Sequence, residues 1–250
     1  MAEQSPVALV TGGAGGIGAA ICTALAAAGF AVAVGYRKSV DEANKLAASL
    51  PGNGHRAVEA RVTDSAQLTQ LAQTIQAHYG RCDVLVNCAG TTRFVPHAAL
   101  DQLDDALIDE ILATNVRGTV AAIRALLPLL QVSPMKSGGV VINISSIAAR
   151  TAMGSNAMYC ASKAAVDNLT MSLARALAPR VRVISVSPGL VDTEFVKSMD
   201  PAWRNEQAAR TPLGRLADPA EVAAAVVAAI TTLTFTTGAV IAVDGGRPLS

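Results

Sequence analysis

Short apolar runs, several of them rich in β-branched residues, recur along the chain and alternate with longer segments that carry helix signals. Such runs are typical of strands that are buried on both faces of a parallel sheet. Strands alternating with helices predict an α/β fold in which helices cover both faces of the sheet. We expect strands over residues 6–10, 31–35, 57–62, 84–90 with a terminal turn, 140–144, 181–186 and 240–243.

Capping residues mark the ends of several predicted helices. Ser39 and Glu42 form one potential capping box, and Asp218 and Glu221 form another that also has a proline at the first helical position. Asp64 is expected to cap a helix that closes before Gly80. Helices are predicted over residues 19–28, 64–78, most of 100–130, 159–178 and from 218 onward. Because no repeat, linker or low-complexity segment divides the chain, we predict one domain over residues 1–250.

Residues 222–243 need separate consideration because they contain no charge and are long enough to span a bilayer. The first half has an Ala/Val helix pattern behind the capping box, whereas the second half holds Gly238 and several threonines. We therefore assign the segment to the core, as a helix, a turn and a buried strand. Residues 1–6 lack the basic and apolar regions of a secretory signal.

Composition narrows the classes of partner. The net charge is +1 and aromatic residues make up 3% of the chain, so a nucleic-acid or anionic-membrane partner is not expected. The four cysteines are scattered, and no His stands at metal-ligand spacing. We read the cysteines as small buried thiols of a cytoplasmic protein, and we predict no metal site.

The central chemical feature is Tyr159-x-x-x-Lys163, which follows an apolar strand ending in Ser145 and Ser146. Residues four apart share one face of a helix, so the Lys163 ammonium can lie beside the Tyr159 phenol. An isolated phenol titrates near ~10, and a cation alongside it favours the phenolate. The pair could therefore exchange protons with a substrate. The alternative is a solvated lysine beside a half-buried tyrosine.

A glycine-rich turn, Gly12 to Gly18, joins the first strand to the first helix. Glycines let the backbone approach a phosphate group, and the helix amino terminus supplies N–H donors. The second strand ends in Tyr36, Arg37 and Lys38, with no acid to bind a ribose 2′-hydroxyl. Cations there would bind a 2′-phosphate, which favours NADP, with NAD still possible. An ordinary strand–helix turn and a solvated basic loop are the alternatives.

Taken together, the motifs resemble the short-chain dehydrogenase/reductase family over essentially the whole chain. The similarity rests on the glycine-rich turn, Asn87-Cys88-Ala89-Gly90, Asn115, Ser146, Tyr159-x-x-x-Lys163, Pro188-Gly189 with Thr193, and Val243-Asp244-Gly245-Gly246. Ser146 matches the family serine because it stands thirteen residues before Tyr159. The resemblance implies a single-domain, doubly wound Rossmann fold and hydride transfer between a nicotinamide and a carbonyl or secondary alcohol.

The resemblance also implies a role for each matched residue. Tyr159 exchanges the proton with the carbonyl oxygen, Lys163 supports the phenolate and binds the nicotinamide ribose, and Ser146 steadies the developing alkoxide. Asn115 holds a water that links Lys163 to solvent. The implied cofactor-binding residues are Gly12, Gly15, Gly16, Ile17, Gly18, Tyr36, Arg37, Lys38, Arg61, Val62, Asn87, Ala89, Gly90, Tyr159, Lys163, Pro188, Gly189, Val191 and Thr193.

Two positions depart from the family pattern. Arg61 stands where Asp or Asn often contacts the adenine, which leaves Val62 to pack there, and Gly15 stands where NADP-preferring relatives often carry a cation. A 2′-phosphate would then depend on Arg37 and Lys38.

The substrate is expected under a lid at about residues 190–215. Phe195, Met199 and Trp203 would form one apolar stripe if this segment were a helix, and the stripe could line the lid or pack on the domain or a neighbouring subunit. Many relatives reduce 3-oxoacyl groups on an acyl carrier protein, for which Arg180 and Lys136 are candidate docking cations or scattered surface charges.

The best interpretation is therefore a 3-oxoacyl reductase that uses NADP(H). Two alternatives are an oxidoreductase of another alcohol or ketone, such as a sugar, polyol or steroid, and a non-catalytic NADP-binding sensor. The complete Tyr/Lys set disfavours the sensor. The resemblance further implies a homo-oligomer, usually a tetramer, in which helices around Asn115 and after Tyr159 could pack across a two-fold axis.

Overall fold

A computed structural model describes residues 5–249, except for the side chain of Phe195. Its seven strands form one parallel sheet in the order β3-β2-β1-β4-β5-β6-β7. The strands are β1 (Val7–Thr11), β2 (Ala31–Tyr36), β3 (Arg56–Glu59), β4 (Val84–Asn87), β5 (Gly139–Ile144), β6 (Val181–Pro188) and β7 (Val240–Val243). The predicted doubly wound α/β sheet is therefore confirmed.

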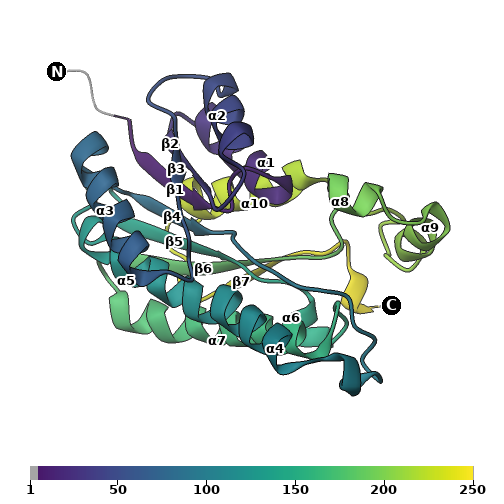
Figure 1. The fold of residues 1–250 in the computed structure, drawn as a ribbon. Helices are drawn as coiled ribbons and strands as arrows, with labels where there is room; N and C mark the ends of the chain where they lie inside the picture. The colour runs from purple at the N-terminus through teal and green to yellow at the C-terminus, as the bar shows by residue number, and fades with distance from the viewer. Residues whose placement is uncertain (1–4, 250) are drawn as a thin grey trace.

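Helices cover both faces of this sheet (Figure 1). One layer holds α1 (Gly16–Ala27), α2 (Val40–Ser49) and α10 (Pro219–Thr231). The opposite layer holds α3 (Ser65–Tyr79), α5 (Gly118–Leu130) and α7 (Ala157–Leu177). Shorter elements are η1 (Leu100–Gln102), α4 (Asp105–Ile111), η2 (Leu112–Arg117), α6 (Ala148–Thr151), α8 (Glu194–Lys197), α9 (Pro201–Ala209) and η3 (Arg247–Leu249).

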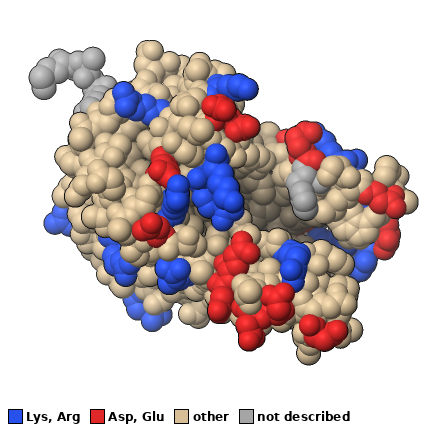
Figure 2. Space-filling model, viewed as in Figure 1, with Lys and Arg blue, Asp and Glu red and all other residues tan. Residues whose placement is uncertain are grey.

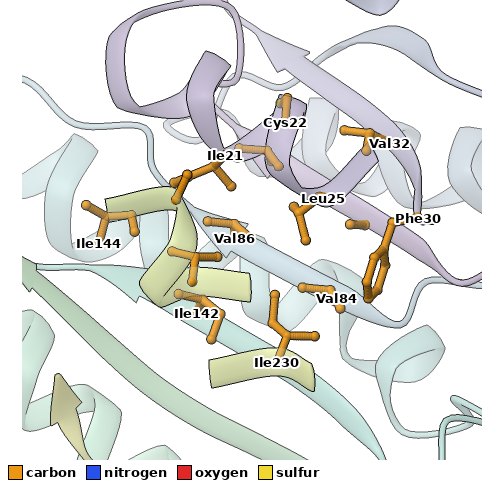
Figure 3. Close-up of a cluster of buried hydrophobic side chains, with 14 of the residues drawn as sticks. Ile21, Cys22, Leu25, Phe30, Val32, Val84, Val86, Ile142, Ile144 and Ile230 are labelled. Atoms are coloured by element: carbon orange, nitrogen blue, oxygen red, sulfur yellow. The ribbon is translucent and has the colours of Figure 1, made fainter. Parts of the chain in front are cut away.

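Alternate residues of each central strand supply two separate cores. On β1, Ala8 and Val10 face α1 and α10, whereas Val7 and Leu9 face α3 and α5. Figure 3 shows the first core, in which side chains from α1, β4, β5 and α10 interdigitate. Since both faces are buried, the strands read as continuous apolar runs rather than as an alternating pattern.

One of the two predicted capping boxes forms and the other does not. The Asp218 carboxylate accepts from the α10 backbone while Glu221 accepts from the Asp218 N–H. Ser39 precedes α2 but makes no side-chain cap hydrogen bond, because its backbone (φ −85°, ψ 63°) is not in the extended conformation typical of an N-cap. Asp64 caps α3 as predicted, and Gly80 ends it in the left-handed conformation.

Some element boundaries differ from the prediction for local reasons. The first helix begins at Gly16 rather than at residue 19, so the last motif glycines belong to its first turn. The third strand ends at Glu59 because the Arg61 N–H bonds the Gln67 side chain and a turn follows. Residues 100–130 are divided into η1, α4, the π-helical η2 and α5. Residues 222–243 fall partly in α10 and partly in β7, and no described helix has the length and apolarity to cross a bilayer.

A buried arginine ties the end of α10 to the sheet. Arg182 on β6 donates to the carbonyl oxygens of Ala229, Ile230, Leu233 and Thr236 at 2.9–3.2 Å. Burial lowers the pKa of this guanidinium from its ordinary value. The Ala229 and Ile230 carbonyls belong to the last turn of α10, where a helix end leaves C=O groups without intrahelical partners, and the other two belong to the turn that follows. Arg182 therefore acts as a side-chain cap on the C-terminus of α10.

Replacement of Arg182 by Met is expected to lower the free energy of unfolding by about 2–4 kcal/mol, because several buried charge-assisted hydrogen bonds are lost. Arg180, exposed two residues earlier, gives the matched control. Arg180→Met should shift the free energy of unfolding by less than about 0.5 kcal/mol. Urea denaturation of both variants measures the difference, and equal midpoints would contradict the capping role.

Candidate active site

A cleft of about 580 Å³ lies at the carboxyl ends of β1, β4, β5 and β6. In Figure 2 the surface is hollowed between the body of the molecule and the α8–α9 segment, with basic side chains beside the hollow and acidic ones below it. Ligands of open parallel sheets bind at this edge, where the strand order reverses between β1 and β4. The sheet topology thus brings together residues that are far apart in the sequence.

The glycine-rich turn forms one wall of the cleft. Gly12 has φ +65°, and a Cβ there would stand 2.9 Å from the Ala89 Cα. A Cβ on Gly18 would stand 2.2 Å from the Gly12 carbonyl oxygen. The Thr11 hydroxyl accepts from the N–H groups of Cys88 and Ala89, which fixes this turn to the end of β4. The backbone can pack this closely because Gly12 and Gly18 have no Cβ.

Tyr159 and Lys163 lie one turn apart on α7 and both line the cleft. The Lys163 ammonium is 5.7 Å from the centre of the Tyr159 ring and donates to the Ile144 carbonyl oxygen at 2.8 Å. Lys163 is buried, whereas Tyr159 is half-buried and faces the open part of the cleft. A cation and a phenol so placed can hold and release a proton at the substrate.

The two serines after β5 have different surroundings. Ser146 is half-buried, lines the cleft, and its hydroxyl accepts from the Ala148 N–H at 3.2 Å. Ser145 is buried, and its hydroxyl donates to the Lys163 carbonyl oxygen at 3.4 Å. Both serines line the cleft, but the Ser145 hydroxyl already donates to the protein, whereas the Ser146 hydroxyl keeps its proton for a substrate oxygen.

Replacement of Ser146 by Ala is expected to lower kcat by about 10²-fold, the usual loss when one donor to a developing oxyanion is removed. Ser145→Ala is the matched control and should change kcat by less than about threefold, because it loses one weak hydrogen bond. Steady-state kinetics on both variants separates the two roles. Equal losses would show that the serine region acts only through packing.

Asn115 packs near Lys163 but does not line the cleft. Its amide accepts from the Thr91 N–H and donates to the Thr91 carbonyl and the Ser162 hydroxyl. A Cβ on Gly90 would stand 3.5 Å from the Asn115 Oδ1 and 3.8 Å from the Lys163 Nζ. The π-helical turn of η2, a feature often found at functional sites, holds Asn115 there.

Most of the residues that the resemblance assigned to the cofactor line this cleft. They are Gly12, Gly15, Gly16, Ile17, Gly18, Arg37, Val62, Ala89, Gly90, Tyr159, Lys163, Pro188, Gly189 and Thr193. The others lie outside it. Tyr36 and Lys38 flank the exposed Arg37, and Arg61 forms an ion pair with Glu59. Asn87 donates to Asn143 in the core, and Val191 is buried against the first core.

Several lining residues escaped the sequence reasoning. Thr114 contributes a buried hydroxyl for which the described residues supply no hydrogen-bond partner. Thr91 and Thr92 follow β4, and Glu194 begins α8. No pattern marks these residues, because each reaches the cleft only after distant strands have paired. Asn156 was also missed, although its place ahead of the Tyr159 helix is typical of an N-cap.

Residues 190–215 do not form the one continuous helix that the apolar stripe would require. Asp200 caps α9 with Pro201 at its start, so α8 and α9 are separate and the expected stripe is not continuous. Met199 and Trp203 do not line the cleft, and the Phe195 side chain lies outside the described part of the structure. Arg204 pairs with Asp192, and Arg247 near the carboxyl end donates to the Gln207 carbonyl and side chain.

The two candidate docking cations lie far from the cleft. Arg180 precedes β6 and Lys136 precedes β5, at the amino-terminal edge of the sheet. The 21 residues of α7 separate Arg180 from Tyr159 by about 30 Å. Neither residue lines the cleft, and the assignment of Arg180 and Lys136 as docking cations for a carrier stays a prediction.

A dinucleotide fits the residues of this cleft. Glycine-lined backbone offers close approach for phosphates, and the Thr114 hydroxyl has hydrogen-bonding capacity unused by the described residues.

The family model described as short chain dehydrogenase matches residues 6–203. The chain belongs to the short-chain dehydrogenase family. It is therefore an oxidoreductase that acts on alcohol or ketone groups with a nicotinamide cofactor.

Individual relatives extend over the whole chain. The "granaticin polyketide synthase putative ketoacyl reductase 2" of Streptomyces violaceoruber is 41% identical, covering 99% of this chain and 98% of that protein. The cis-4-hydroxycyclohexanecarboxylate dehydrogenase of Sinomonas cyclohexanicum is 38% identical, covering 96% and 95%. A "putative short-chain dehydrogenase/reductase" structure from Burkholderia xenovorans has a TM-score of 0.91 at 35% identity, covering 99% of this chain and 100% of that one.

Proposed function

We propose that this short-chain dehydrogenase uses NADP(H) to reduce a carbonyl to a secondary alcohol, with a 3-oxoacyl group as the substrate class. The observation that carries the proposal is the convergence of Ser146, Tyr159 and Lys163 on the same cleft as the glycine-rich turn. The similarity to a ketoacyl reductase supports the substrate class.

In this proposal the bound nicotinamide cofactor supplies or accepts the hydride. Tyr159 donates a proton to the carbonyl oxygen, and the Ser146 hydroxyl stabilises the charge that develops there. Lys163 stabilises the phenolate left on Tyr159 and would hold the ribose of the cofactor. Asn115 bonds the Thr91 backbone and the Ser162 hydroxyl on α7. From this position it would hold the water that links Lys163 to solvent.

We also propose which residues hold the cofactor. The turn from Gly12 to Gly18 would receive the phosphates, with Ala89 and Gly90 beneath the sugars and Val62 against the adenine. Pro188, Gly189 and Thr193 would flank the nicotinamide. Arg37 is the one basic residue at the end of β2 that lines the cleft, which supports NADP over NAD.

Replacement of Arg37 by Ala is therefore expected to raise the KM for NADPH by about 10–100-fold, the effect of losing one charged hydrogen bond to a phosphate. The KM for NADH, which has no 2′-phosphate, should hardly change. Lys38→Ala is the matched control, because Lys38 is exposed outside the cleft. An equal effect of both substitutions on both cofactors would contradict recognition of the 2′-phosphate by Arg37.

A dehydrogenase of cyclic secondary alcohols is the second candidate, favoured by the similarity to the cis-4-hydroxycyclohexanecarboxylate enzyme. The deciding experiment follows absorbance of NADPH and NADH with three substrates: a 3-oxoacyl thioester, the same acyl group on an acyl carrier protein, and 4-oxocyclohexanecarboxylate. Preferential turnover of either acyl substrate supports the proposal. Preferential turnover of the cyclic ketone supports the second candidate, and no turnover with intact cofactor binding supports a sensor.

We further propose that the enzyme is cytoplasmic and forms a homo-oligomer. All four cysteines are free, which is consistent with a reducing compartment. β7 lies at the edge of the sheet with only partly buried apolar residues, and Phe235 nearby is fully exposed. An exposed apolar edge strand of this kind is usually covered, and a second copy of the chain could cover this one. Light scattering on the purified protein tests the assembly, for which a tetramer is expected.

A further inference from the structure

The first turn of α7 is fixed by a residue to which the proposed chemistry assigns no role. Asn156 is 1% exposed and caps α7 immediately ahead of Tyr159. Its Oδ1 accepts from the Tyr159 N–H at 2.7 Å. The backbone of the proposed proton donor is thus held directly by this side chain.

The other end of the same amide holds the loop that follows β4. The Asn156 Nδ2 donates to the Arg93 carbonyl oxygen at 2.8 Å and to the Thr92 hydroxyl at 3.2 Å. Because one partner is an N–H and the other a carbonyl, the orientation of the amide is fixed by chemistry. A carboxylate could replace the acceptor half but would face the Arg93 carbonyl with no proton to share.

This loop forms part of the cleft. Thr91 and Thr92 line it, and the Val95 N–H donates to the carbonyl oxygen of Ser155, next to Asn156. The Thr92 hydroxyl also bonds the Ser155 hydroxyl. These hydrogen bonds join residues 92–95 to residues 155–156, with the buried Asn156 amide between the two segments.

We infer that Asn156 is a positioning residue that sets the distance between the Tyr159 hydroxyl and the cleft wall at Thr91 and Thr92. The acceptor half of the amide places Tyr159, and the donor half places the wall. This inference rests on the proposed function, since it concerns the same site. Its consequence is that the two halves affect different kinetic constants.

Two variants separate the halves. Asn156→Ser keeps a side-chain acceptor suited to an N-cap but removes the donors to the loop. We expect the KM for the carbonyl substrate to rise about fivefold to tenfold while kcat falls by less than about threefold. Asn156→Ala removes both halves, and kcat should fall by about 10–50-fold in addition. Asn168→Ala, at an exposed position of the same helix, is the control and should change neither constant.

Hydrogen exchange gives a readout that does not depend on turnover. Asn156→Ser should speed amide exchange in residues 92–95 and leave the Tyr159 amide protected, whereas Asn156→Ala should speed both. Equal kcat and KM changes in the two variants, or unchanged exchange in residues 92–95, would overturn the inference. A wild-type protein that turns over no carbonyl would refute the proposed function, and the exchange pattern would still decide the role of Asn156.

Discussion

Replacement of Tyr159 by Phe is expected to lower kcat by about 10³-fold, within the range that a positioned general acid contributes. The phenol hydroxyl is the proton donor of the proposed reaction, and the half-buried ring that carries it lines the cleft. Phe fills the same space, so the fold and the affinity for NADPH should be retained. Stopped-flow measurement of hydride transfer, with NADPH affinity from fluorescence, checks both statements.

A second hydroxyl serves as control for that experiment. Tyr79 lies on α3 and donates to the Gly54 carbonyl oxygen, remote from the cleft. Tyr79→Phe should leave kcat within about twofold, because it removes one structural hydrogen bond. If Tyr159→Phe retained wild-type turnover, the assignment of the proton donor would be wrong.

The second large effect is expected from Gly18→Ala. The added Cβ would meet the Gly12 carbonyl oxygen at 2.2 Å, and both atoms belong to backbone that cannot rotate away. The turn must open, which removes N–H groups from the place where the phosphates of the cofactor are proposed to bind. We expect NADPH affinity to fall by about 100-fold, the loss of one or two charge-assisted hydrogen bonds. Isothermal titration measures the loss.

Gly15→Ala provides the comparison for stability. No atom lies within 4 Å of a Cβ placed there, and the backbone at φ −145° is open to any residue. Its melting temperature should match the wild type, whereas Gly18→Ala should lose about 1–3 kcal/mol through overpacking. A Gly18→Ala protein with wild-type melting temperature and NADPH affinity would show that the contact with Gly12 is not needed.

Local signals allowed much of the fold to be predicted. Asp64 and Asp218 act within one turn of their own helices, so their caps were visible in the sequence. The Ser39 box failed because the path of the chain after β2 sets the backbone of Ser39. The π turn at η2 and the break before Asp200 also depend on how a segment meets its neighbours. The periodicity of apolar residues within one segment does not reveal its tertiary contacts with other segments.

The candidate site likewise contains residues that the sequence predicts from local spacing and residues that only the tertiary structure brings together. Tyr159 and Lys163 are one helical turn apart, so their proximity followed from spacing. Thr114 and Asn156 could not be found like that, since the Asn156–Thr92 contact joins residues 64 positions apart. Arg37 was predicted to meet a 2′-phosphate, whereas Arg61 was a departure at the position that often contacts the adenine. The structure shows that Arg37 lines the cleft, while Arg61 pairs with Glu59 and lies outside it.

The hydrogen bonds from Arg247 to Gln207 have a practical consequence for changing the substrate selectivity of this enzyme. Because Arg247 of η3 bonds Gln207 of α9, we expect changes in the last few residues to alter the position of α9 without replacing a side chain that lines the cleft. If α9 covers the substrate as proposed, a mutant library confined to residues 245–249 should change substrate selectivity and leave the proposed proton donor in place. Affinity tags for such work belong at the opposite end of the polypeptide.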